Sequence, residues 1–163
     1  MTAVWRITRI EPSLSEQALI IFERWQNWSA FDRSVADGTM ARVRPLSVLA
    51  HCPEEALLSV EGAGCFELQI IRVANGAGEL ARAHLVSGPI ATYRASGASR
   101  LCLFDIIHGN DLPALALFCE WPNASVAVST YLAAELMRGS ADVASPILDT
   151  TRFLANRFSV LAN

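Results

Sequence analysis

The stretch from Pro45 to Ala74 reads PLSVLAHCPEEALLSVEGAGCFELQIIRVA and sets the expected fold. Pro45 suits the first position of a short helix, because proline has no N–H to leave unsatisfied there. Residues 56–61 and 65–74 are apolar runs joined by Gly-Ala-Gly, a pattern that predicts an antiparallel hairpin. One face of the second arm consists of Phe66, Leu68 and Ile70. This hairpin is expected to be part of an antiparallel sheet.

A second hairpin is predicted downstream. Residues 99–108 and 112–120 flank a Gly-Asn-Asp turn, and both faces of each arm are apolar. Strands that are apolar on both faces are covered on both sides, so these two are expected to be central. A tight turn would pair Asp105 with Ala114. Shorter strands are expected at residues 3–10 and 89–95.

Helices are expected before, between and after the hairpins. A Ser-Leu-Ser-Glu capping box and the apolar spacing after it predict an amphipathic helix over residues 14–28. Residues 29–44 show no sustained period and are expected to form a loop. Further helices are expected at residues 78–87, 130–137 and 146–161. The whole pattern predicts an α+β fold with an antiparallel sheet.

The composition is strongly apolar. The chain has 163 residues, of which 52% are hydrophobic and 18% charged, whereas about 25% are charged in a typical soluble domain. We expect one domain over residues 1–163. The apolar excess has to cover a large core, an internal pocket or an oligomer interface. A pocket for a small apolar ligand together with a homodimer is favoured, with Trp25 and Trp28 as the expected dimer contact.

The net charge and the spacing of the cysteines argue against several classes of protein. The net charge of -3 argues against a nucleic-acid-binding protein, which usually carries a basic face. No apolar run reaches the roughly 20 residues of a membrane span, and the N-terminus lacks a signal-peptide core, so a cytoplasmic location is expected. The four cysteines contain no C-x-x-C pair, so no metal site is predicted and no cofactor is indicated.

Asp105 is the ionisable residue most suggestive of chemistry. It lies in a predicted strand on a face shared with Leu101 and Leu103, where an unpaired carboxylate is costly. The alternative is a structural carboxylate that reaches a backbone N–H or an arginine. His108 lies at the rim of the same hairpin but on the opposite strand face, which disfavours a catalytic dyad with Asp105.

The segment from Trp28 to Val73 resembles the proteobacterial stand-alone PAS-like domains. In that family a tryptophan ends an N-terminal helix, two prolines bracket a short apolar helix, and a strand with an acidic end leads through a glycine turn into the next strand. The matching positions here are Trp28, Pro45, Pro53, Glu61, Gly62–Gly64 and Phe66–Ile70. The sequence departs from the pattern at Arg44, where the family has an acidic residue, and it lacks the basic residue expected in the second strand.

The resemblance implies a PAS-like antiparallel sheet of about five strands, with an N-terminal helix and extra C-terminal helices. It also implies a non-catalytic sensing or regulatory role in signal transduction, through ligand binding or dimerisation. The expected ligand-binding residues are Phe66, Leu68, Ile70, Tyr93, Leu103, Asp105 and Phe118. Two other classes stay open. One is a cone-shaped α+β enzyme similar to ketosteroid isomerases and polyketide cyclases, with Asp105 as acid or base, and the other is an interaction module with a filled core.

Overall fold

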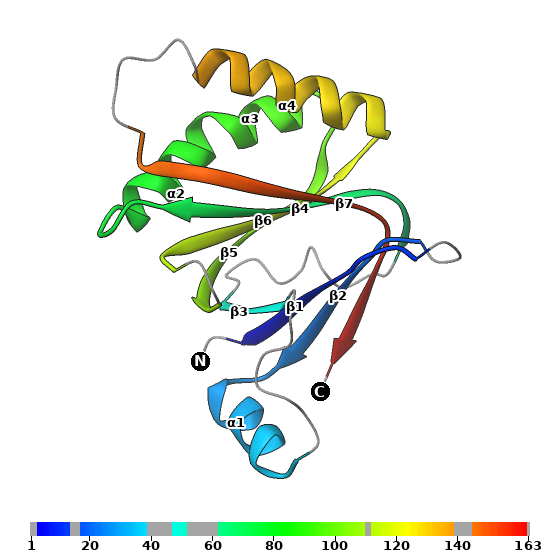
Figure 1. Ribbon diagram of the computed structural model, residues 1–163, viewed down its shortest axis with the longest axis vertical. Helices are drawn as coiled ribbons and strands as arrows, with labels where there is room; N and C mark the ends of the chain where they lie inside the picture. The colour runs from blue at the N-terminus through cyan, green and yellow to red at the C-terminus, as the bar shows by residue number, and fades with distance from the viewer. Residues whose placement is uncertain are drawn as a thin grey trace.

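The described residues form a closed β-barrel with helices packed on its outside (Figure 1). The computed structural model describes residues 3–13, 17–38, 47–51, 62–109, 112–138 and 145–162. The strands are β1 (Val4–Ile10), β2 (Leu19–Trp25), β3 (Ser47–His51), β4 (Gly62–Val73), β5 (Ser99–His108), β6 (Ala114–Trp121) and β7 (Ile147–Ala162). The helices are α1 (Trp28–Ala36), α2 (Gly78–Ser87), α3 (Pro89–Ala95) and α4 (Ala124–Arg138).

Strand β7 closes the barrel. The strand order around the barrel is β1-β2-β7-β4-β6-β5-β3. The first part of β7 pairs antiparallel with β4, and its last part pairs parallel with β2. The other pairings between described strands are antiparallel. The sheet is therefore mixed, and one long strand joins its two halves.

The expected PAS-like α+β sheet of about five strands is wrong, because the described strands form a closed seven-stranded barrel. The main cause of this error is that two segments expected as helices form strands. Residues 19–25 form β2, in which Ile20 and Phe22 alternate into the interior with 0% exposure. Residues 147–162 form β7, in which Phe153 and Ala155 also alternate into the interior and are buried. Both segments also carry an apolar spacing near 3.6, so the sequence alone does not separate the two periods.

Three shorter segments also differ from expectation. The chain after Pro45 forms strand β3 in place of a short helix. Residues 89–95 form helix α3 in place of a strand, since Pro89 occupies its first turn. Helix α1 lies within the expected loop, and Asn27 caps it by accepting a hydrogen bond from the Ala30 backbone N–H at 3.0 Å.

Several local predictions are confirmed. Strands β1 and β4, the β5–β6 hairpin and helices α2 and α4 lie where the sequence indicates them. The β5–β6 register differs by one residue, because Asp105 pairs with Leu115 and not with Ala114. The first arm of the predicted upstream hairpin, residues 56–61, lies outside the described residues.

The barrel interior is filled by aromatic side chains. Six of them, each at most 2% exposed, are Trp5, Phe22, Phe66, Phe104, Phe118 and Phe158. The Phe22 ring lies 4.9 Å from that of Phe118 and 5.8 Å from that of Phe104, centroid to centroid. Such ring pairs add to the free energy gained from burial alone.

The outer wall of the barrel is covered by helices on two sides. Helices α2, α3 and α4 pack over the wall formed by β4 to β7, through Leu85, Tyr93 and Ala127 (Figure 1). Helix α1 packs over β1 to β3 through Phe31, which is 0% exposed. Among the described helices, none is long and apolar enough to cross a membrane.

Candidate functional site

The residues expected to form one ligand pocket lie on two sides of the barrel wall. Phe66, Leu68 and Phe118 point into the barrel, and Ile70 packs against the same interior cluster. Tyr93 and Leu103 belong instead to the layer between the wall and helices α2 to α4, and Asp105 shares the outward face of Leu103. The structure therefore does not bring these residues together.

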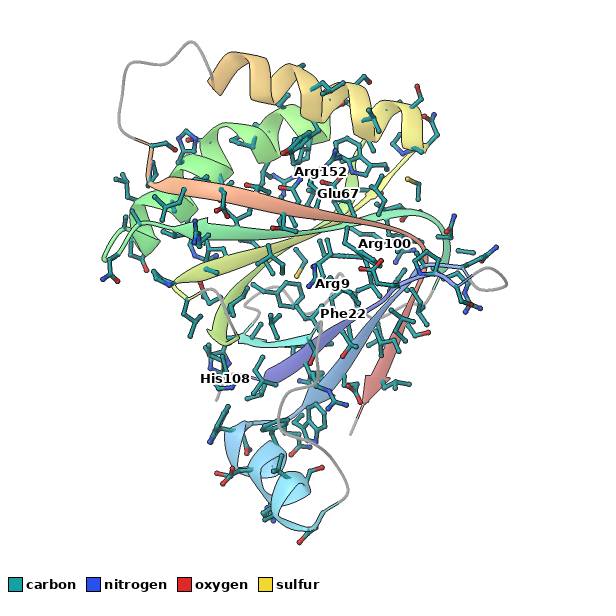
Figure 2. All side chains as sticks on the ribbon, viewed as in Figure 1. Arg9, Phe22, Glu67, Arg100, His108 and Arg152 are labelled. Atoms are coloured by element: carbon teal, nitrogen blue, oxygen red, sulfur yellow. The ribbon has the colours of Figure 1, made fainter. Side chains whose placement is uncertain are left out.

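Asp105 lies on the outer wall of the barrel. Arg82 of helix α2 donates a hydrogen bond to its carboxylate, and the Asp105 side chain is 51% exposed. A cone-shaped enzyme would need this carboxylate inside a deep apolar cavity. His108 is exposed at the far end of β5 and points away from the barrel (Figure 2). The arrangement matches the structural alternative for Asp105, a surface ion pair with an arginine.

The two tryptophans expected at a dimer contact have different environments. Trp25 is 3% exposed and packs against Phe31, with ring centroids 5.0 Å apart. Trp28 is 41% exposed at the start of α1. Trp25 is thus already covered by its own chain. A homodimer through these residues stays a prediction, and Trp28 is its accessible member.

A buried polar network joins the barrel wall to the helices. Glu67 of β4 is 0% exposed, and its carboxylate accepts two hydrogen bonds from Arg152 of β7, at 2.8 and 2.7 Å. Trp121 Nε1 donates a third at 2.9 Å, and Gln69 Nε2 donates a fourth. A carboxylate has about four acceptor positions, so those of Glu67 are filled. Figure 2 shows Glu67 and Arg152 beneath helix α4.

Arg152 connects this network to helix α4. Its Nη2 donates to the Ala127 carbonyl at 3.3 Å, and its guanidinium lies 3.9 Å from the centroid of the Tyr131 ring. Burial lowers the pKa of Arg152, but the hydrogen bonds and charge of Glu67 outweigh burial and raise it. Both oxygens of the Glu67 carboxylate, and Nε and Nη2 of Arg152, therefore have structural partners. The network attaches α4 to the wall and leaves no exposed surface on Glu67 for a ligand.

A different polar cluster lies at one end of the barrel, where β1 and β6 end and β2 and β5 begin. We call it the arginine end, and its members are Arg9, Arg100, Glu120, Phe158, Gly62 and Gly64. Arg100 Nε donates to the Glu120 carboxylate at 2.6 Å, and the Arg100 guanidinium lies 5.5 Å from the Phe158 ring centroid. The two charged side chains are 32% and 30% exposed. They face inward at the rim, where solvent can reach them.

Strand pairing places Arg9 at the same level of the barrel as Phe158. Arg9 pairs with Ile20, and Ile20 pairs with Phe158, so the three residues lie on consecutive strands. With strands about 4.8 Å apart, the Cα atoms of Arg9 and Phe158 are about 10 Å apart. Arg9 shares the inward face of Trp5 and Ile7. Figure 2 shows Arg9 and Arg100 between the β4–β7 wall and the β1–β2 strands.

Arg9 differs from Arg100 in having no partner among the described residues. Within the part of the chain that the structure describes, no hydrogen bond or ion pair is made by its guanidinium, although the residue is half-buried. A partly desolvated charge is costly unless an opposite charge or a hydrogen bond compensates it. The donors of Arg9 are thus available to a ligand at the rim.

Two irregularities in the strands shape this end of the barrel. The β4–β7 register shifts between Ala63 and Phe66, and the β5–β6 register shifts between Ser99 and Cys102. Within the second shift, Arg100 has a φ of 49°, in the left-handed region that non-glycine residues rarely adopt. Bulges re-aim side chains and are common at barrel rims and beside functional sites. A strained residue is a reason to suspect function at this position.

Glycine at position 62 lets the Phe158 ring approach the backbone. A Cβ there would lie 3.2 Å from Phe158 Cε1, closer than most real contacts. The Phe158 ring can therefore lie close to the β4 backbone and beneath the Arg100 guanidinium at the rim. Ala63 and Gly64 next to it are exposed and present little bulk to an incoming molecule.

The sequence carries a weak signal for the residues of this site and none for how they come together. Arg9 interrupts the inward face of β1 after Trp5 and Ile7, which is an unexpected place for a charge. Arg100 and Glu120 lie at the open end of a predicted hairpin, one on each arm, so their cross-strand contact was open to prediction. No local pattern indicates the bulge that turns Arg100 inward or the closure that brings β7 next to β2.

No protein-family model matches this chain, and no curated protein matches it either. The PAS-like resemblance receives no support from these comparisons, and the fold that it implied is wrong. Among the described residues, no group of three or more histidine, cysteine, aspartate or glutamate side chains is arranged to hold a metal ion. The function is therefore argued from the geometry of the arginine end.

Proposed function

We propose that this chain is a small-molecule-binding protein and that its ligand contacts the arginine end of the barrel. The observation that carries the proposal is Arg9, a half-buried residue whose guanidinium has no partner among the described residues. Barrel mouths are a common location for ligand sites, and a few polar groups at an apolar surface are the usual form of such sites. The aromatic interior beneath Arg9 supplies that surface.

Binding at the rim fits the packing of the interior better than binding inside it. The six interior rings are almost completely buried and contact one another. A ligand in the middle of the barrel would have to displace them. At the rim, Arg100 and Glu120 are partly exposed, and Ala63 and Gly64 are open to solvent.

The proposal is tested by screening a library of small fragments with ligand-observed saturation-transfer NMR. We expect a set of fragments that bind the native chain and lose their signal with Arg9→Gln. Arg157→Gln is the matched control, because Arg157 is an exposed arginine that neighbours Phe158 but lies on the opposite strand face. If no fragment binds, or if Arg9→Gln and Arg157→Gln bind the same fragments equally, the proposed function is wrong.

A further inference from the structure

We infer that the ligand of the arginine end is a monocarboxylate attached to a flat apolar body, an inference that rests on the proposed function. The first step is the charge of the site. Among the described residues whose side chains lie on the inward face at this rim, two guanidinium groups, of Arg9 and Arg100, accompany one carboxylate, that of Glu120. Within that set, one positive charge is left over. A monoanion balances it, whereas a phosphate dianion would place additional negative charge beside Glu120.

The second step concerns the shape of the anionic group. Arginine presents a planar fork of N–H donors that matches the two oxygens of a carboxylate. In Arg100, Nε already donates to Glu120. The N–H donors of the Arg9 guanidinium have no acceptor among the described residues. The expected contact is thus a bidentate pair between Arg9 and the ligand carboxylate, with Arg100 as the second positive charge.

The third step concerns the rest of the ligand. Phe158 lies beneath the Arg100 guanidinium at 5.5 Å, and the Arg100 side chain is still 32% exposed. A second flat group can stack on this guanidinium from the solvent side, because aromatic rings attract guanidinium planes. Exposed Ala63 and Gly64 leave room beside it. The body of the ligand is therefore expected to be flat and apolar, and to stay at the rim above the filled interior.

Four probes separate these features: benzoate, benzamide, acetate and inorganic phosphate. Benzamide keeps the ring and loses the charge, acetate keeps the charge and loses the ring, and phosphate replaces the carboxylate. Each is titrated into the native chain while the arginine Nε–Hε signals are followed by NMR. We expect benzoate to shift the signals of Arg9 and Arg100 and to bind about tenfold or more tightly than each of the other three.

Variants assign the effect to particular side chains. Arg9→Gln is expected to weaken benzoate binding about ten- to hundredfold and to leave benzamide unchanged, because only the charge-assisted pair is lost. Arg157→Gln should leave both unchanged. Arg9→Lys keeps the charge without the fork and should bind benzoate with intermediate affinity, which also guards against a folding defect in Arg9→Gln. Glu120→Gln removes the opposing carboxylate and should admit phosphate.

The outcomes distinguish the inference from the function on which it rests. Benzamide could bind as tightly as benzoate while the screened fragments still lose their signal with Arg9→Gln. That result would refute the inference that the ligand carries a carboxylate, but it would support the binding site. Phosphate binding tighter than benzoate binding in the native chain, or unchanged phosphate affinity in Glu120→Gln, would refute the charge balance. If no fragment in the screen binds at this end, both the function and the inference fail.

Discussion

Glu67 and Arg152 are an ion pair in which each partner depends on the other. The Glu67 side chain is 0% exposed and that of Arg152 17% exposed. Removing one charge of such a pair leaves the other buried without compensation. We expect Glu67→Gln to lower the free energy of unfolding by about 3–5 kcal/mol. Urea denaturation near neutral pH, followed by far-UV circular dichroism, measures this change.

The same pair of strands supplies a matched control. Arg72 of β4 and Asp149 of β7 form a second ion pair, at 2.6 Å, with side chains 45% and 54% exposed. Exposed pairs contribute about 0–1 kcal/mol, so Asp149→Asn should cost less than about 1 kcal/mol. Equal losses in Glu67→Gln and Asp149→Asn would contradict the assignment of Glu67 as the buried anchor of helix α4.

Cys119 and Tyr93 lie beside this network and predict a loss of stability in alkali. Burial raises the pKa of the Cys119 thiol above 9.0 and that of the Tyr93 hydroxyl above 10.0, and the charge of Glu67 raises both further. A group whose pKa is raised on folding stabilises fully below its unfolded pKa, and this stability is lost as the pH rises toward the folded pKa.

The free energy of unfolding is therefore expected to be level to about pH 9 and then to fall, by up to about 1.4 kcal/mol per pH unit for each group. Urea denaturation at a series of pH values from about 7 to about 11 measures the slope. Cys119→Ala should make the fall shallower from about pH 9, and Tyr93→Phe from about pH 10. A wild-type profile that stays level to pH 11 would show that neither group is buried as described.

Among the elements, those with local signals were predicted from the sequence. The β5–β6 hairpin is an example, because its two apolar arms and polar turn are neighbours in the chain. Helix α2 is another, since Gly88-Pro89 ends it in the expected order. The one-residue register difference at Asp105 has a local cause too. The connection is longer than a tight turn, and the sequence did not show where pairing begins.

The elements that close the barrel were not predictable from local pattern. Ile147, Thr151, Leu154 and Phe158 follow a helical spacing, and a helix was expected over residues 146–161. In the structure the same residues belong to β7, whose hydrogen-bonding partners, β2 and β4, lie far away in the sequence. Long-range pairing overrides local propensity here. Because the sequence predicts helices for both β2 and β7, it does not predict their pairing or the closed rim around Arg9.

At the scale of the whole molecule, the barrel has two different surfaces, its outer wall and its interior. The outer wall is covered by α1 on one side and by α2 to α4 on the other (Figure 1), with Glu67 and Arg152 holding α4. The interior is aromatic and filled along its length, from Phe104 to Phe158. Among the described residues of the arginine end, Arg100 and Glu120 are partly exposed, so polar groups within reach of a ligand lie at this rim.

A substitution at Phe22 tests whether the barrel interior is closed and filled as a whole. Its ring contacts those of Trp5, Phe104, Phe118 and Phe158, so Phe22→Ala should leave a cavity and lower the free energy of unfolding by about 3–5 kcal/mol. An apolar cavity of this kind stays dry and binds benzene. Benzene should therefore raise the melting temperature of Phe22→Ala but not that of the native chain or of Leu132→Ala, whose side chain is 56% exposed in the native chain. Equal stabilisation of the native chain by benzene would mean that the barrel already holds an apolar void, and the ligand would then be sought inside it.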